Sequence, residues 1–240
     1  MTAPAARIAF VAPRFADGPT VGGAETLLRH LAEEAAAAGR QVEFLTTCAR
    51  DHFTWQNVLP AGVRNVGPLR VHCFPVDDTR DVATFERLQT RLCRTGALTA
   101  EEEQLWLRHG VNSTALCEHL RRESGGLDRV VVGPYLFALT VHASRVAPHK
   151  TLLLPCLHDE PFAYLPTIAR MFRSVAGVLF NSEPERDLAH RLFGLPAACS
   201  TVVGMGLDPF TTDPAAFRRA HGITAAYILY SGRREPLKGT

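Results

Sequence analysis

The segment that most constrains the fold is residues 8–31, where an apolar run, a glycine-containing loop and a helical pattern follow one another. The apolar run, residues 8–12, predicts a buried strand of a parallel sheet. Beyond the loop, apolar residues at helical spacing predict a helix that ends at Gly39. The first-turn N–H groups of such a helix can bind an anion, and the glycine pair Gly22-Gly23 lets a ligand approach the backbone. A simple turn into the helix explains the two glycines equally well, because their spacing is not G-x-G-x-x-G.

Short apolar runs then alternate with helical periodicity along the chain. Residues 81–124 form a helical excursion of two or three helices, and Thr99 with Glu102 predicts a capping box. This alternation predicts an α/β fold with a doubly wound parallel sheet, Rossmann-like in architecture. The remaining strands are predicted at residues 41–47, 69–74, 129–132, 150–155, 175–180 and 200–203.

Ligands of such sheets bind at the carboxyl ends of the strands. Three loops are therefore expected to meet at one edge: residues 14–23, 156–160 and 181–183. Ser182 and Glu185 predict a second capping box, at the start of the helix that follows the third loop.

The composition favours a globular protein of the cytoplasm. Hydrophobic residues make up 46% of the 240 residues, and the formal net charge of +2 gives no reason to expect nucleic acid as a partner. No apolar run is long enough for a membrane span. Six cysteines are scattered singly, without a C-x-x-C pair, and are expected to be reduced residues of the core.

From Gly204 onward the composition becomes rich in glycine, proline and threonine. We expect an N-terminal domain at residues 1–205, a linker at residues 206–225 and the truncated start of a second domain at residues 226–240. A new buried strand is predicted at residues 227–232.

Four motifs, in order, resemble glycosyltransferase family 4. Ser231-Gly232-Arg233 followed by Lys238-Gly239 resembles the G-R-x-x-x-x-K-G motif that opens the donor-binding domain of that family. Residues 21–25, 181–187 and 206–208 resemble its first loop, a strand end with the following helix, and a G-V-D turn, although Gly204-Met205 stands where Pro-Asn is usual. The resemblance implies the GT-B fold, with this chain supplying the acceptor-side domain and the first strand of the donor-binding domain.

The resemblance also implies site residues. Arg233 and Lys238 would hold the donor diphosphate, a role that suits a guanidinium fork and an ammonium group. The backbone of Gly22 and Gly23 would reach the diphosphate or the transferring sugar. His158 resembles the catalytic histidine near the donor sugar, and an ordinary loop histidine is an equally open interpretation.

Three further residues are candidates for contact with the acceptor or the sugar: Glu25, Asp159 and Ser182. For Glu25, a role in complementing the helix dipole is the competing interpretation. A metal site at residues 158–160 is disfavoured, because consecutive side chains rarely face one ion.

The implied activity is retaining transfer of a sugar, of the hexosyltransferase type, from a nucleotide-sugar without metal or cofactor. The acceptor would be a saccharide, a lipid-linked molecule or a small molecule, and contact with a membrane surface is possible for the family. By itself this length of chain is expected to be inactive. Two alternatives stay open: a non-catalytic module that binds carbohydrate or protein, and a nicotinamide-dependent enzyme, which is disfavoured because Thr46-Thr47-Cys48 stands where an acidic residue is expected.

Overall fold

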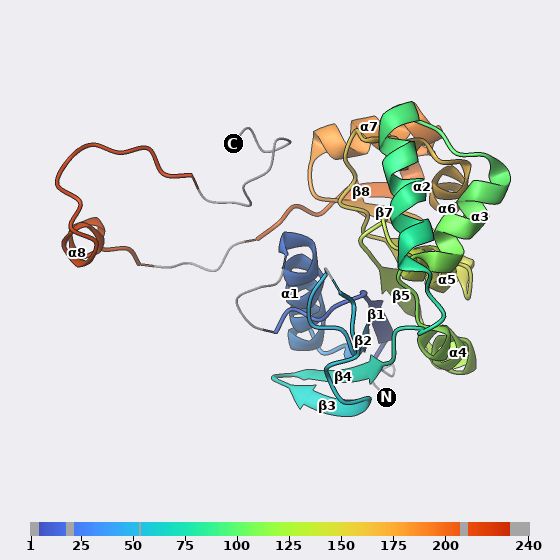
Figure 1. Cartoon of the computed structure of the whole chain (residues 1–240). Coiled ribbons are helices and arrows are strands. Elements are labelled where there is room, and N and C mark those ends of the chain that lie inside the picture. Colours follow the sequence, from blue (N-terminus) through green and yellow to red (C-terminus); the bar gives the residue numbers. More distant parts are fainter. Residues whose placement is uncertain (1–4, 18–21, 53, 207–210, 231–240) are drawn as a thin grey trace. The chain divides into compact units, whose positions relative to one another are not determined.

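The computed structural model describes residues 5–17, 22–52, 54–206 and 211–230 (Figure 1). The chain divides into two compact units, Met1–Met205 and Gly206–Thr240. The first unit contains one eight-stranded sheet in the order β3-β4-β2-β1-β5-β6-β7-β8. All neighbouring strands are parallel except β3 and β4. The strands are β1 Arg7–Val11, β2 Gln41–Thr47, β3 Gly62–Val66, β4 Leu69–Phe74, β5 Arg129–Val132, β6 Thr151–Leu153, β7 Gly177–Phe180 and β8 Ser200–Val202.

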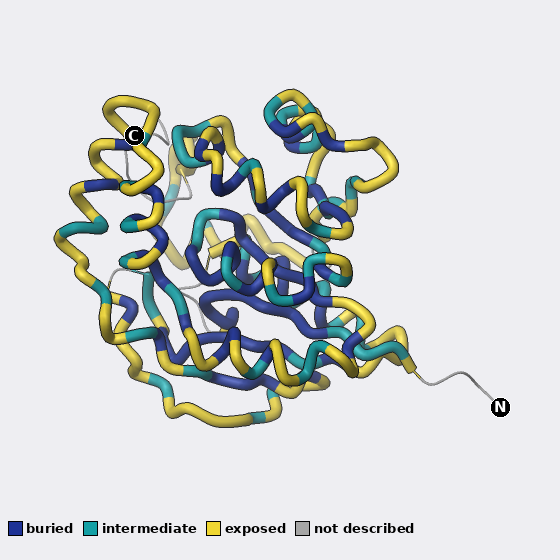
Figure 2. The backbone as a smooth tube through the Cα atoms, turned by 90° about the vertical axis from the view of Figure 1, so that its right-hand side faces the viewer, coloured by how far each residue is buried: buried dark blue, intermediate teal, exposed yellow. Residues whose placement is uncertain are grey.

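Successive side chains of a strand point to opposite faces of the sheet. Here the residues on both faces are apolar. In β1, Ala9 and Val11 belong to one buried cluster, whereas Phe10 belongs to the other. In β5, Val130 lies with the first set and Val131 with the second. Figure 2 shows the buried residues gathered in the interior, with exposed residues mainly on the outer segments. Residues that alternate in this way require helices on both sides.

The helices divide unequally between the two faces (Figure 1). Helix α1, Gly23–Ala37, packs its buried Leu27, Leu28 and Ala32 on the face that carries Phe10. The opposite face is covered by α2 Val82–Thr95, α3 Ala100–His109, α4 Thr114–Glu123, α5 Ala138–Ser144, α6 Pro166–Ser174 and α7 Glu183–Phe193, all of which contribute to the other cluster. The architecture is therefore the predicted doubly wound α/β sheet.

Most predicted elements are confirmed, including three helices in the excursion and a complete capping box between Thr99 and Glu102. Two helices differ in their bounds. The sequence pattern also predicts a helix at about residues 135–146, of which only α5, Ala138–Ser144, is helical, and one at about residues 162–173, where a 3-10 turn, Pro161–Tyr164, precedes α6. Strand β3 was not predicted, since this edge strand has no buried residue and thus no apolar alternation.

The second unit contains helix α8, Pro214–Ala220, capped by the Asp213 side chain. The strand predicted at residues 227–232 is wrong for residues 227–230, which form no strand. Ile228 is 100% exposed and Leu229 70% exposed. The physical reason is that no described strand pairs with this backbone, and an unpaired strand has no stability of its own. The remaining two residues of that prediction lie outside the described part of the chain.

The expectation that all six cysteines lie in the core is also wrong. Cys93 and Cys199 are exposed, and Cys156 is partly buried. All six thiols are free. Among the described helices, none has the length and apolar character needed to cross a membrane.

Candidate functional site

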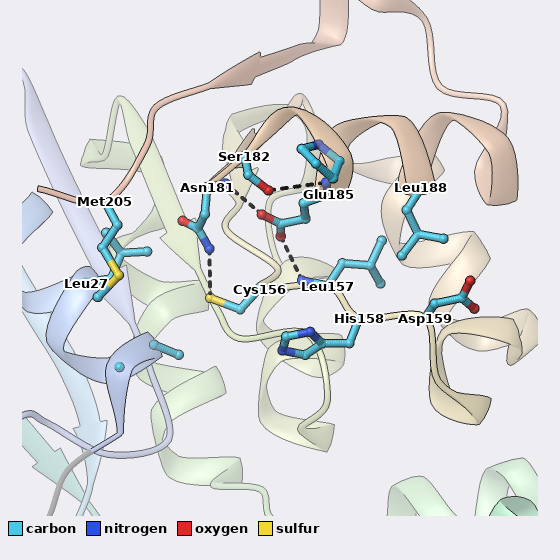
Figure 3. A pocket seen from close by; sticks show the side chains of 13 residues that line it. Leu27, Cys156, Leu157, His158, Asp159, Asn181, Ser182, Glu185, Leu188 and Met205 are labelled. Atoms are coloured by element: carbon cyan, nitrogen blue, oxygen red, sulfur yellow. Dashed lines mark hydrogen bonds between the residues drawn. The ribbon is translucent and has the colours of Figure 1, made fainter. Parts of the chain in front are cut away.

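A pocket of about 530 Å³ lies at the carboxyl edge of the sheet, within the first unit (Figure 3). It is formed where the N-terminus of α1 meets the loops that follow β6 and β7. The described parts of the three predicted strand-end loops therefore contribute to one site. The lining residues are Gly23, Ala24, Leu27, Cys156, Leu157, His158, Asp159, Asn181, Ser182, Pro184, Glu185, Leu188 and Met205.

Helix α1 begins beside this pocket with a bare backbone. Gly22 is its N-cap and provides no side-chain cap, while its carbonyl accepts from the Thr26 amide at 3.2 Å. A Cβ at Gly22 would lie only 2.8 Å from Glu25 Oε2. Gly23 lines the pocket, and a Cβ there would lie 3.8 Å from Met205 Cε. The positive end of the α1 dipole thus faces the pocket without a capping side chain.

Glu25 is buried, with 4% of its surface exposed, and it is not one of the pocket-lining residues. Its carboxylate forms an ion pair with the equally buried Arg14. The Arg14 guanidinium also lies over the Trp55 ring, 5.7 Å from the ring centroid. The ion pair between Glu25 of α1 and Arg14 therefore links the first loop to the helix. Neither Arg14 nor Trp55 was among the predicted site residues, because a buried ion pair leaves no spacing signal in the sequence.

Glu185 connects the other two loops. Its Oε1 accepts from the Leu157 amide and its Oε2 from the Asn181 amide, each at 2.7 Å. Burial raises the pKa of the Glu185 carboxyl, although the Leu157 and Asn181 donors act in the opposite direction. The predicted capping box is thus confirmed only on one side: Ser182 Oγ accepts from the Glu185 amide at 3.3 Å, while the Glu185 carboxylate holds the strand ends.

Cys156 and Asn181 form the floor between these loops. Cys156 has a positive φ of 52°, and its Sγ accepts from Asn181 Nδ2 at 3.4 Å. Burial raises the pKa of the Cys156 thiol to about 11, so the thiolate form is scarce at neutral pH. Asn181 Oδ1 is buried and finds no hydrogen-bond partner among the described residues.

The loop after β6 is held by its carboxylates. Glu160 Oε1 accepts from the Tyr135 hydroxyl at 2.6 Å, and burial together with this contact raises the pKa of Tyr135. Asp159 accepts from Tyr164 at 2.6 Å and from Arg191 at 3.0 Å. Hydrogen bonds from these two donors hold the pKa of Asp159 below its ordinary value.

His158 lies between these anchored residues, at the exposed rim of the pocket (Figure 3). Its imidazole has no hydrogen-bond partner within the described part of the chain, and it is therefore available to a ligand. The sequence could indicate the turn but not which of the three polar side chains would remain unengaged.

The structure thus brings together Gly23, His158, Asp159 and Ser182, with Gly22 adjacent to them. Arg233 and Lys238 lie outside the described residues. The sequence did not predict that Glu185 joins the two loops or that Met205 lines the pocket. For Glu185 the only signal was its place in a helix cap. For Met205 it was the departure from the Pro-Asn of the family motif. Within the described residues, no group of three or more His, Cys, Asp or Glu side chains is arranged to hold a metal ion.

Comparisons with solved structures identify the class of fold. A trehalose-6-phosphate structure from E. coli with UDP-2-fluoro glucose bound is similar at 14% identity with a TM-score of 0.52, and the match covers 90% of this chain and 54% of that one. An α,α-trehalose-phosphate synthase (UDP-forming) from Burkholderia vietnamiensis is 14% identical with a TM-score of 0.48, over 85% of this chain and 49% of that one. No protein-family model matches the sequence, and a search of curated proteins found none that is similar.

The first of these similarities shows the fold alone: a Rossmann-like α/β unit. The chain spans about half the length of the structure that it matches.

Proposed function

We propose that this chain is the acceptor-side part of a retaining, metal-independent glycosyltransferase that uses a nucleotide-sugar as donor. The observation that carries the proposal is the meeting of the α1 N-terminus with the loops after β6 and β7 in one pocket. Its support from the fold is the similarity to a structure with a UDP-sugar analogue bound. We also predict that the protein is located in the cytoplasm and contacts a membrane surface.

In the proposed reaction, an acceptor hydroxyl oxygen forms a bond to the anomeric carbon of the donor. The bond from that carbon to the diphosphate breaks, the diphosphate leaves with the electron pair, and it takes the proton of the hydroxyl. No protein nucleophile is required, which agrees with a Cys156 thiol that stays protonated. The backbone of Gly23 and the α1 dipole face the donor phosphates, and His158 contacts the transferring sugar.

Arg233 and Lys238 supply the positive charge in this proposal. A guanidinium and an ammonium group would bind the diphosphate and stabilise it as it leaves. Contacts of charged groups with phosphate contribute about 1.5–3 kcal/mol each, so losing one should weaken binding by about tenfold to a hundredfold.

The experiment is calorimetric titration of the full chain with UDP, ADP and GDP. We expect Arg233→Ala and Lys238→Ala each to weaken the preferred nucleotide diphosphate by at least tenfold. Arg234→Ala removes the same charge from the neighbouring position of the motif and is the matched control. Equal affinities in all three variants and the unaltered chain would contradict the assignment.

One observation favours a second candidate, a non-catalytic carbohydrate-binding module. The pocket-lining residues include no Lys or Arg within the described chain. Such a module would bind saccharides with His158 and would show no affinity for any nucleotide diphosphate in the same titration.

A further inference from the structure

The walls of the pocket are largely apolar. Leu27, Leu157 and Leu188 lie along it, and Met205 closes it beside the start of α1 (Figure 3). Met205 is 49% exposed, although large apolar side chains of this kind usually lie in the core. A concave surface lined by apolar side chains binds ligands that present hydrocarbon or aromatic surface. Met205 stands at the position where the sequence pattern would place asparagine, so the apolar wall is a property of this chain.

Apart from the α1 N-terminus, which the proposed function assigns to the donor phosphates, the described pocket offers no lysine or arginine to an anion. Its described lining contains two carboxylates, Asp159 and Glu185, and both are already engaged by donors from the chain. A ligand seated against these walls is therefore expected to be neutral.

One polar atom of the pocket, Asn181 Oδ1, has no hydrogen-bond donor among the described residues. It is buried, and a buried unpaired carbonyl costs about 1–3 kcal/mol. Figure 3 shows this oxygen pointing toward the side of the pocket where Met205 lies, while the amide nitrogen faces Cys156. A ligand hydroxyl can donate to it, whereas a fully ionised phosphate has no hydrogen to give.

We propose that the pocket binds the acceptor of the sugar, and that this acceptor is a neutral alcohol or glycoside carried on an apolar body. The inference rests on the proposed function and specifies the substrate class of the same site. The apolar body lies along Leu27, Leu188 and Met205, and a hydroxyl of the acceptor donates to Asn181. His158, at the rim, faces the end where the donor sugar arrives.

The test compares ligands that share a sugar and differ in the apolar group. The full chain is titrated with methyl, octyl and phenyl β-D-glucosides, each below its micelle concentration. We expect the octyl or the phenyl compound to bind at least tenfold more tightly than the methyl compound, because burying two or three extra carbon groups already accounts for that ratio. The stronger of the two distinguishes an aliphatic from an aromatic body.

Two variants locate the binding. Met205→Asn should reduce the octyl or phenyl preference by about fivefold or more, while Val203→Asn should leave it unchanged. Val203 is similarly exposed, at 43%, but does not line the pocket. Equal binding of the three glucosides, or equal effects of the two substitutions, would overturn the inference.

A parallel titration with UDP, ADP and GDP separates this inference from the proposed function. If the alkyl or aryl preference is absent while one of these nucleotides binds, only the proposed acceptor class is overturned. If none of the three nucleotides binds while the preference is present, the result argues against sugar transfer and leaves a site for apolar glycosides.

Discussion

The Glu185 side chain receives amide hydrogens from two loops that follow different strands. The Leu157 and Asn181 amides donate to its two oxygens, and the Ser182 hydroxyl accepts from the Glu185 amide. Because the carboxylate is buried and satisfied by backbone donors, it fixes the loop of His158 against the start of α7. The geometry of the pocket therefore depends on this residue, which itself need not touch a ligand.

The raised pKa of Glu185 gives a prediction with a definite sign. The folded chain binds this proton more tightly than the unfolded chain, so the group adds free energy of unfolding as pH falls from neutral toward its ordinary value. Glu185→Gln removes that contribution. Urea unfolding at pH 7 and pH 5 should show the unaltered chain gaining stability relative to Glu185→Gln on acidification.

Glu183→Gln is the matched control, because Glu183 lies exposed in the same helical turn and the substitution removes the same charge. This variant should keep the response of Glu185 to pH. Identical pH responses in the two variants would exclude Glu185 as the titrating group.

At this scale the sequence predicts types of residue better than their partners. The loop positions of Gly23, His158 and Ser182 follow from strand-end patterning, and the structure brings them into one pocket. The burial of Glu25 with Arg14 could not be foreseen, since the pair forms across a loop whose path depends on the folded sheet.

Among the helices, α3 has the most completely formed N-terminus. Thr99 Oγ1 accepts from the Glu102 amide at 3.3 Å, and Glu102 Oε2 accepts from the Thr99 amide at 3.0 Å. Glu102 also forms an ion pair with Arg91 of α2 at 2.7 Å. The cap thus joins two helices of the excursion.

Thr99→Ala should lower the free energy of unfolding by about 1 kcal/mol, the usual cost of losing a side-chain N-cap. Thr90→Ala makes the same substitution at an exposed position inside α2 and should change stability by less than about 0.5 kcal/mol. Urea denaturation of both variants gives the comparison. A loss at Thr90 as large as at Thr99 would show that the cap is not responsible.

Elements were predictable wherever burial imposes a pattern. Strands β1, β2 and β5 carry buried residues on both faces and were correctly located. Strand β3 is unburied and was missed, and residues 227–230 have the composition of a strand but no described partner. Apolar composition indicates a strand only when the fold provides a neighbour to pair with.

At the scale of the whole molecule, the buried core belongs to the first unit. Among the described residues, the last buried apolar side chain along the chain is Leu195. The division of the chain at residue 205 therefore separates the eight-stranded sheet from a segment whose described part contains one short helix.

A chain that ends at Met205 should consequently unfold within a few degrees of the full chain in a thermal melt. A chain that ends at Pro196 loses β8 and uncovers the edge of β7, so its melting temperature should fall markedly. If removal of residues 206–240 lowered the melting temperature as much as removal of β8, the core would have to extend beyond the first unit.

All residues that line the pocket belong to this same unit. Under the proposed function, the contacts of the acceptor come from the first unit alone, so we expect the acceptor to bind before any donor arrives. Binding of the acceptor should then be measurable with no nucleotide-sugar present.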